Sequence, residues 1–146
     1  MFFETPLTCI TLWEPWATLI AWKVKKIETR HWYTSYRGPI GIHAATRKLT
    51  QQDHDEYRRI AFDLKILGVT IKHPHYDFDF GCIIAVANLK RCERMEDLSK
   101  YSAVEKVCGN FEIGRYAWVL EDVRSLDVPI PAKGKQGLWK YTGEPV

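Results

Sequence analysis

The chain has 146 residues, which is enough for one domain with a hydrophobic core and too few for two comfortable ones. Apolar residues make up 46% and charged residues 27%, proportions typical of a globular protein, and no run approaches the roughly 20 apolar residues of a membrane-spanning helix. The formal net charge of +3 is low for a dedicated nucleic-acid-binding protein, so its distribution along the chain matters more than its sum.

The first residues carry no secretory signal. The stretch MFFETPLTCITLW lacks the basic start and the small-residue cleavage site of a signal peptide. We therefore expect a cytoplasmic protein that works without a membrane. As a separate expectation, the protein is a monomer.

Neither the cysteines nor the histidines form a complete metal-binding pattern. The four cysteines are scattered without a CxxC pair, which predicts reduced and mostly buried thiols. His73, His75, Asp77 and Asp79 alternate and would share one side of an extended segment, but a polar loop explains them without an ion. We predict no metal and no other cofactor, with a divalent metal ion as an option if the protein is a nuclease.

In chain order, the N-terminal third predicts a strand, a helix and two further strands. Residues 6–13 alternate as a strand does, and residues 14–25 follow as a helix with Pro15 in its first turn. Residues 25–32 are typical of a strand or an extended stretch, and residues 40–45 form a strand after a turn. The apolar side chains of the helix fall at helical spacing and predict a stripe that faces the core: Trp16, Leu19, Ile20 and Val24.

The rest of the chain predicts one long helix and three more strands. Residues 50–68 form the clearest helix, with Thr50 as N-cap and Gly68 where the helix should end. The later expected elements are strands at 80–92, 115–126 and 136–142, a short helix within 95–109, and a Pro/Gly-rich connection at 127–137. Five to six strands with two to three flanking helices indicate an α+β fold, a small barrel that opens on one side.

Positive charge gathers in the first third of the chain. Residues 1–49 hold seven Lys or Arg against three Glu, residues 50–80 hold four basic against six acidic residues, and residues 81–146 hold ten against nine. Four of the six tryptophans lie in the same third: Trp13, Trp16, Trp22 and Trp32. Basic residues interleaved with aromatic ones suit phosphate contact combined with base stacking.

The segment ITLWEPWATLIAWKVKKIETRHWYTSYRGPIGIHAA, residues 10–45, resembles the ASCH family. The hallmark of that family is Gly-x-Lys-x-x-Glu-x-Arg after a helix, and here it maps onto Lys23, Lys25, Glu28 and Arg30. The distant segments GRYAWVLEDVR and IPAKGKQGLW also look like the bacterial and phage members of the family.

The resemblance covers roughly residues 7–47 and 81–140, and implies a single ASCH domain over residues 1–146 with a helical insertion near 50–80. It implies a PUA-like open β-barrel, from a superfamily that binds RNA and in several branches reads modified bases. Within the ASCH family it implies RNA or DNA binding, with ribonuclease activity in some members and acetylcytidine amide hydrolysis in others.

Lys23 departs from the family pattern. The family has its first glycine there, usually just past the helix end in a left-handed conformation that costs a lysine about 1 kcal/mol. We therefore expect either a differently built turn or a helix that runs further.

The motif side chains suit an anionic ligand. Lys25 and Arg30 can hold phosphate, and Lys25 is the favoured cation. Glu28 can accept from a base amino group, act as a general base, or pair with Arg30, which lies two residues on and on the same side of an extended chain.

Aromatic and basic side chains outside the motif complete the predicted nucleic-acid-binding set. Trp13 precedes the helix and can stack a base at the mouth of a cleft. Tyr36 and Arg37 lie at a turn that suits phosphate or base contact, and Arg115 and Tyr116 resemble another family signature. The same patterns favour structural roles for Glu14 as a helix cap and for His43 as a hydrogen-bonded core histidine.

These observations predict a nucleic-acid-binding domain that favours RNA over DNA and uses a basic and aromatic cleft. The alternative is a ribonuclease or a nucleoside-processing hydrolase in the same cleft, with Lys25, Glu28 and Tyr36 as the catalytic group. Acetylcytidine amide hydrolysis is disfavoured, because Glu28 stands where those enzymes have their threonine nucleophile. The neighbouring Thr29 would point to the opposite face of an extended chain.

Overall fold

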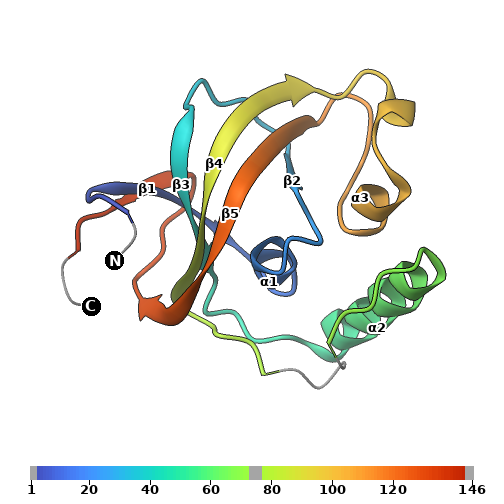
Figure 1. Ribbon diagram of the computed structural model, residues 1–146, viewed down its shortest axis with the longest axis horizontal. Helices are drawn as coiled ribbons and strands as arrows, with labels where there is room; N and C mark the ends of the chain where they lie inside the picture. The colour runs from blue at the N-terminus through green and yellow to red at the C-terminus, as the bar shows by residue number, and fades with distance from the viewer. Residues whose placement is uncertain (1–2, 73–76, 144–146) are drawn as a thin grey trace.

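A six-stranded mixed sheet curls around the first helix (Figure 1). The computed structural model describes residues 3–72 and 77–143. The strands are β1 (Leu7–Leu12), β2 (Ile27–Arg30), β3 (Gly38–Ala44), β4 (Cys82–Arg94), β5 (Tyr116–Pro131) and β6 (Leu138–Tyr141). Their order in the sheet is β2-β5-β4-β3-β1-β6, with β1 parallel to β3 and the other pairs antiparallel.

The sheet bends because β4 and β5 are long and irregularly paired. Their register shifts between Ile83 and Ala85 and twice more along the pair, and each such bulge increases the local twist of a strand. The helices are α1 (Trp16–Ala21), α2 (Gln51–Ile66), the 3₁₀ turn η1 (Leu98–Lys100) and α3 (Ala103–Val107). This half-closed sheet with flanking helices confirms the expected α+β fold and open barrel.

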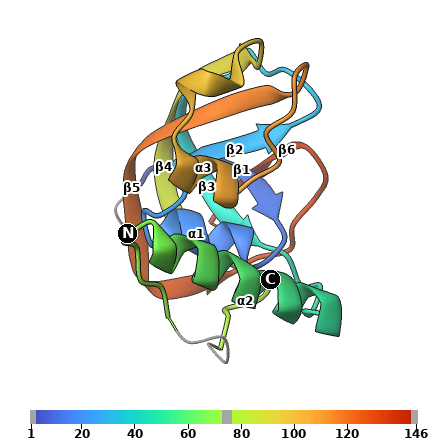
Figure 2. The ribbon, with the colours of Figure 1, turned by 90° about the vertical axis from the view of Figure 1, so that its right-hand side faces the viewer.

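Helix α1 lies against the inner face of the sheet, and α2 runs alongside α1 outside it (Figure 2). Ala17 and Ile20 of α1 are buried among strand residues, while Leu19 packs with Ile60 and Leu64 of α2. The N-cap at Thr50 is confirmed, since its hydroxyl accepts from the amide of Asp53 at 3.2 Å. None of the described helices has the length and apolar character needed to cross a bilayer.

The turn after α1 corrects the expectation for Lys23. Lys23 adopts the left-handed conformation itself, with φ of 63°, so the turn is neither rebuilt nor replaced by a longer helix. The amide of Lys23 donates to the carbonyl of Ile20 at 2.9 Å, and that of Val24 donates to Leu19 at 3.1 Å. These two bonds form the Schellman arrangement that usually requires glycine. These two bonds offset the conformational cost of the left-handed backbone at Lys23. The Lys23 side chain is exposed.

The predicted connection at 127–137 is partly wrong, because β5 continues to Pro131. Proline has no amide hydrogen to donate to a neighbouring strand, so it is tolerated only where one side of its strand is unpaired or at a bulge. Strand β2 pairs only with Tyr116–Val119 of β5, so the later part of β5 pairs on one side alone, with β4. Proline is therefore tolerated there, and the connection to β6 shrinks to residues 132–137.

Candidate nucleic-acid interface

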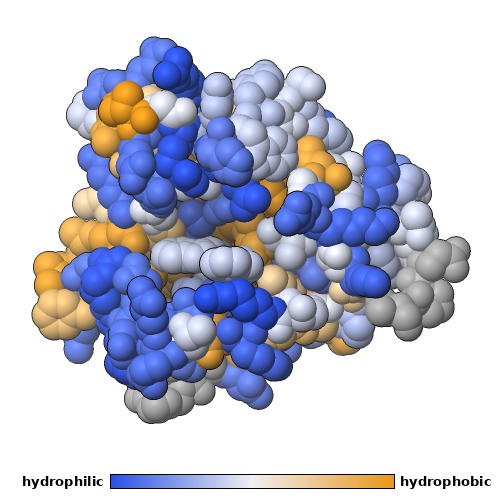
Figure 3. Space-filling view, turned by 180° about the vertical axis from the view of Figure 1, so that it is seen from behind, coloured by the Kyte–Doolittle hydropathy of each residue, from blue (hydrophilic) through white to orange (hydrophobic). Residues whose placement is uncertain are grey.

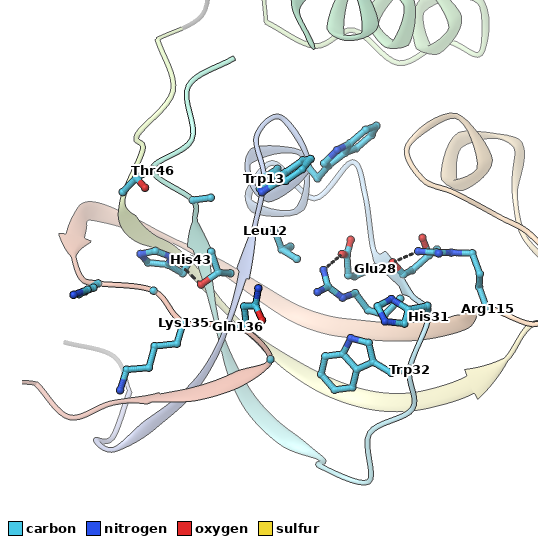
Figure 4. A pocket seen from close by; sticks show the side chains of 18 residues that line it. Leu12, Trp13, Glu28, His31, Trp32, His43, Thr46, Arg115, Lys135 and Gln136 are labelled. Carbon is cyan, nitrogen blue, oxygen red and sulfur yellow. Dashed lines mark hydrogen bonds and ion pairs between the residues drawn. The ribbon is translucent and has the colours of Figure 1, made fainter. Parts of the chain in front are cut away.

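A cleft of about 980 Å³ opens between β2, the start of α1 and the β5–β6 loop (Figure 4). Its described lining residues are Thr11, Leu12, Trp13, Trp16, Glu28, Thr29, Arg30, His31, Trp32, His43, Ala45, Thr46, Arg115, Lys133, Gly134, Lys135, Gln136 and Gly137. The face opposite to the view of Figure 1 is hollowed at its centre and bordered mostly by hydrophilic side chains (Figure 3).

Trp13 lies at the mouth of the cleft, where β1 ends and α1 has not yet begun. Its side chain is 56% exposed, an unusual state for a tryptophan. The guanidinium carbon of Arg47 lies 4.0 Å from the centroid of a Trp13 ring, and Arg47 Nη1 lies 2.9 Å from Asp53 Oδ2 in the first turn of α2. The indole is therefore supported by a cation that is itself anchored. A role for Trp13 in base stacking stays a prediction.

The expected helix cap at Glu14 is confirmed. Glu14 is 1% exposed, and its Oε1 accepts from the amide of Thr18 at 2.8 Å while Oε2 accepts from the Thr18 hydroxyl. Burial raises the pKa of this carboxyl to about 7, although both hydrogen bonds from Thr18 act to lower it. The group that orders the start of α1 next to Trp13 thus titrates near neutral pH.

Glu28 lies on the cleft surface between two cations. Lys25 Nζ is 3.4 Å from Glu28 Oε1, and Arg30 Nη1 is 3.2 Å from Glu28 Oε2. Lys25 itself is 1% exposed, donates to the carbonyl of Ile27 at 2.6 Å and does not line the cleft. Of the three residues predicted to be catalytic, Lys25 and Glu28 lie together, whereas Tyr36 lines a different hollow. Their roles stay predictions.

Arg115 joins the same wall from the start of β5. Its Nη2 donates to the carbonyl of Thr29 at 3.0 Å, which ties it to β2. Its Nε is buried and has no hydrogen-bond partner among the described residues. A buried donor without a partner is costly.

The other three predicted contact residues do not line the cleft. The hydroxyl of Tyr36 donates to the carbonyl of Pro39, and Arg37 Nη1 donates to the carbonyl of Tyr36 at 2.7 Å. Tyr116 packs edge-on against Tyr33 with ring centroids 5.9 Å apart. The structure thus separates Tyr36, Arg37 and Tyr116 from the four residues that it brings together: Trp13, Glu28, Arg30 and Arg115.

The sequence analysis did not assign the β5–β6 loop to the site. Lys133, Gly134, Lys135, Gln136 and Gly137 all line the cleft on the side opposite Glu28 and Arg115 (Figure 4). Two lysines on either side of a glycine, in a connection that follows a strand, are a usable sequence signal for this wall.

His43 is confirmed as a hydrogen-bonded core histidine, although it also reaches the cleft. It is 1% exposed, and its Nε2 lies 2.7 Å from the carbonyl oxygen of Ala132. Burial lowers its pKa, which favours the neutral ring. No group of three His, Cys, Asp or Glu side chains within residues 3–72 and 77–143 could hold a metal, and all four cysteines are free. His73 and His75, two members of the alternating His/Asp set, lie outside the described residues.

Comparison with known proteins shows which sequences the chain is similar to. The model of the ASCH domain matches residues 10–130. The chain is 26% identical over 139 residues to activating signal cointegrator 1 of Homo sapiens, and 25% identical over 139 residues to the same protein of Mus musculus. Each match covers 90% of this chain and 22% of the relative, so the chain spans about a fifth of the length of the curated relatives that it matches.

Proposed function

The chain belongs to the ASCH domain family, and from that premise we propose that its cleft binds single-stranded nucleic acid, RNA in preference to DNA. The observation that carries the proposal is the pairing, on one concave surface, of an exposed tryptophan with cations on both walls. Phosphate contact and base stacking need that combination, because phosphates attract cations and every base has a face that can stack.

The charge of the cleft favours an anion. Glu28 is the one acidic side chain among the described lining residues, and Lys25 and Arg30 both lie against it. On the facing wall, Lys133 and Lys135 form no ion pair with any residue that the structure describes. The positive charge of the cleft is therefore only partly compensated within the protein.

The size of the cleft suits more than one nucleotide unit. Its volume of about 980 Å³ lies at the upper end of the range of roughly 300–1,000 Å³ for small-molecule sites. A nucleotide stacked on Trp13 would leave room for phosphates on either side. Neutral polar side chains on the rim, such as Thr46 and Gln136, offer hydrogen bonds to a ribose 2′-hydroxyl, the group that distinguishes RNA from DNA.

The test is fluorescence anisotropy with matched 10-nucleotide RNA and DNA strands between 50 and 300 mM salt. We expect binding to RNA that weakens with salt, with a slope of about −0.7 in log K per phosphate contact. Arg30→Ala with Arg115→Ala should lower the magnitude of that slope, whereas Arg58→Ala on α2, outside the cleft, should not. Absence of binding at 50 mM salt would sink the proposal, and equal affinity for DNA would remove the preference for RNA.

Ribonuclease action in the same cleft is the second candidate, and one observation favours it. The Glu28 carboxylate reaches the cleft surface beside the Arg30 guanidinium, so a potential base and a phosphate-binding cation are adjacent. Labelled RNA incubated with the protein, with and without Mg²⁺, should be cleaved if this holds. Cleavage that survives Glu28→Gln would remove Glu28 from the mechanism.

A further inference from the structure

Residues 132–137 form one wall of the cleft and are anchored to the barrel at their first residue. The amide of Ala132 donates to the carbonyl of Gly81 at 3.1 Å. The carbonyl of Ala132 accepts a hydrogen bond from His43 Nε2 at 2.7 Å. The loop therefore starts from a fixed point on the floor of the cleft rather than from a free chain end.

The anchoring histidine belongs to a chain of buried hydrogen bonds. A carbonyl oxygen only accepts, so His43 Nε2 carries the hydrogen, and Nδ1 is left to accept from the Thr11 hydroxyl, whose oxygen lies 3.1 Å away. The Thr11 oxygen in turn accepts from Trp139 Nε1 at 2.9 Å. In this Thr11–His43–Trp139 network the imidazole is neutral, and both of its ring nitrogens and the Thr11 hydroxyl take part in hydrogen bonds.

Gly134 rests directly on this network. A Cβ atom at position 134 would lie 2.6 Å from Thr11 Oγ1 and 2.8 Å from His43 Nδ1. Both distances are shorter than real carbon contacts, and neither neighbour can move without breaking its hydrogen bond. Only glycine lets the loop lie this close, so the position of the loop depends on the contact between residue 134 and the network.

A lysine stands on each side of this contact point. Lys133 and Lys135 are exposed, and both line the cleft. Neither forms an ion pair with any residue of the described chain. Two ammonium groups without an ion pair therefore stand on an anchored backbone, on the loop that lies across the cleft from Arg30 and Arg115. Less conformational freedom is lost when such a preformed cationic edge meets its ligand than when a mobile loop does.

We propose that residues 132–137 are a phosphate-binding arm: Lys133 and Lys135 contact the phosphodiester backbone of a strand bound in the cleft. His43 and Gly134 are positioning residues that hold the arm against the barrel. This inference rests on the proposed function, and it adds an element outside the hallmark motif. The arm lies on the β5–β6 loop and the motif on β2, so the strand is gripped from both sides.

The experiment compares the salt dependence of binding to the 10-nucleotide RNA across three variants. Lys133→Ala with Lys135→Ala should reduce the magnitude of the slope of log K against log salt by about 1.4, which is 0.7 for each lost phosphate contact. Lys106→Ala with Lys140→Ala removes the same charge from exposed positions outside the cleft and should leave the slope unchanged. Gly134→Ala keeps every charge, yet it should reduce the magnitude of the slope toward that of the Lys133/Lys135 variant, because the added Cβ atom displaces the arm.

The outcomes separate the arm from the proposed function. If the wild-type protein fails to bind at 50 mM salt, both ideas fall. If the wild type binds and the Lys133/Lys135 variant keeps the wild-type slope, the arm is wrong while the nucleic-acid-binding function stands. If Gly134→Ala keeps the wild-type slope, the positioning role is wrong. A purely structural effect of Gly134→Ala would lower the folded fraction and the amplitude of binding without changing the slope.

Discussion

The guanidinium of Arg47 lies over a ring of the Trp13 indole, with its central carbon 4.0 Å from the ring centroid. Because Arg47 is also paired with Asp53 at the start of α2, the long helix outside the barrel is connected to the mouth of the cleft. This arrangement covers one side of an indole that is 56% exposed. The exposed remainder of the ring is available for stacking.

Trp13→Ala is expected to weaken binding to single-stranded RNA about 5- to 150-fold, since stacking of one base on an aromatic side chain is worth about 1–3 kcal/mol. Anisotropy titrations at one fixed salt concentration measure the loss. The matched control is Phe62→Ala, which removes an aromatic side chain that is 66% exposed on α2. Wild-type affinity in the Trp13 variant would exclude the indole from the interface.

Arg47→Met should weaken the same binding by a factor of about 2–5. Methionine keeps an apolar stem against the indole but removes the cation–π contact, worth about 0.5–1 kcal/mol at an exposed site. Asp53→Asn, which keeps the arginine and removes its partner, should have a smaller effect in the same titration. An Arg47 variant as severe as Trp13→Ala would instead point to direct contact between Arg47 and phosphate.

Lys25→Met tests whether the motif lysine supports the cleft or contacts the ligand. Lys25 is buried against Glu28 and the carbonyl of Ile27, and removal of one partner from a buried pair costs about 3 kcal/mol or more. We expect urea denaturation to show this loss, and a much smaller one for Arg30→Ala, whose side chain is 26% exposed. Unchanged stability with abolished RNA binding would return Lys25 to the direct role that its position in the motif predicts.

Lys23→Gly should raise the free energy of unfolding by about 1 kcal/mol. The backbone at Lys23 has φ of 63°, which glycine adopts without the steric cost of a Cβ atom. Lys23→Ala keeps the Cβ atom, so its free energy of unfolding should stay close to the wild-type value. Equal effects of the two substitutions in parallel urea titrations would show that the left-handed turn carries no strain.

The buried carboxyl of Glu14 should make stability depend on pH. Its pKa is raised from 4.5 to about 7 in the folded protein, so the unfolded chain loses this proton first as pH rises. The contribution of Glu14 is therefore fully present below about pH 4.5 and is lost as pH rises through 7, with a total change of about 3 kcal/mol.

Glu14→Gln mimics the protonated carboxyl and should remove this dependence. Relative to the variant, the wild type should lose stability between pH 5 and pH 8 in urea titrations. Glu112→Gln, at an exposed position, provides the control, because its difference from wild type should stay constant. A constant difference for Glu14→Gln as well would show that the Glu14 pKa is not raised.

Local patterns predicted the elements that depend on neighbours in the chain. The side chain of Thr50 and the amide of Asp53 are three residues apart, so the start of α2 could be recognised from spacing alone. The same holds for Glu28 and Arg30, which extended alternation placed on one side and which lie 3.2 Å apart. In these cases the interacting groups belong to one segment, and a short-range periodicity decides their geometry.

Tertiary structure alone decided what the cleft contains and what lies beneath it. Lys25 stands in the turn between α1 and β2, where no periodicity assigns a face, and only the packing around Gly109 and Glu28 buries it. Residues 132–137 lie across the cleft from β2, about a hundred residues earlier in the chain. They are brought there by the pairing of β6 with β1, which itself pairs with β3 on its other side. Local patterns were enough to recognise α2, most strands, the hallmark motif and the family, whereas α1 (Trp16–Ala21) is shorter than the helix predicted at 14–25. Strand pairing and burial are non-local, so the two walls of the cleft became visible only in the folded protein.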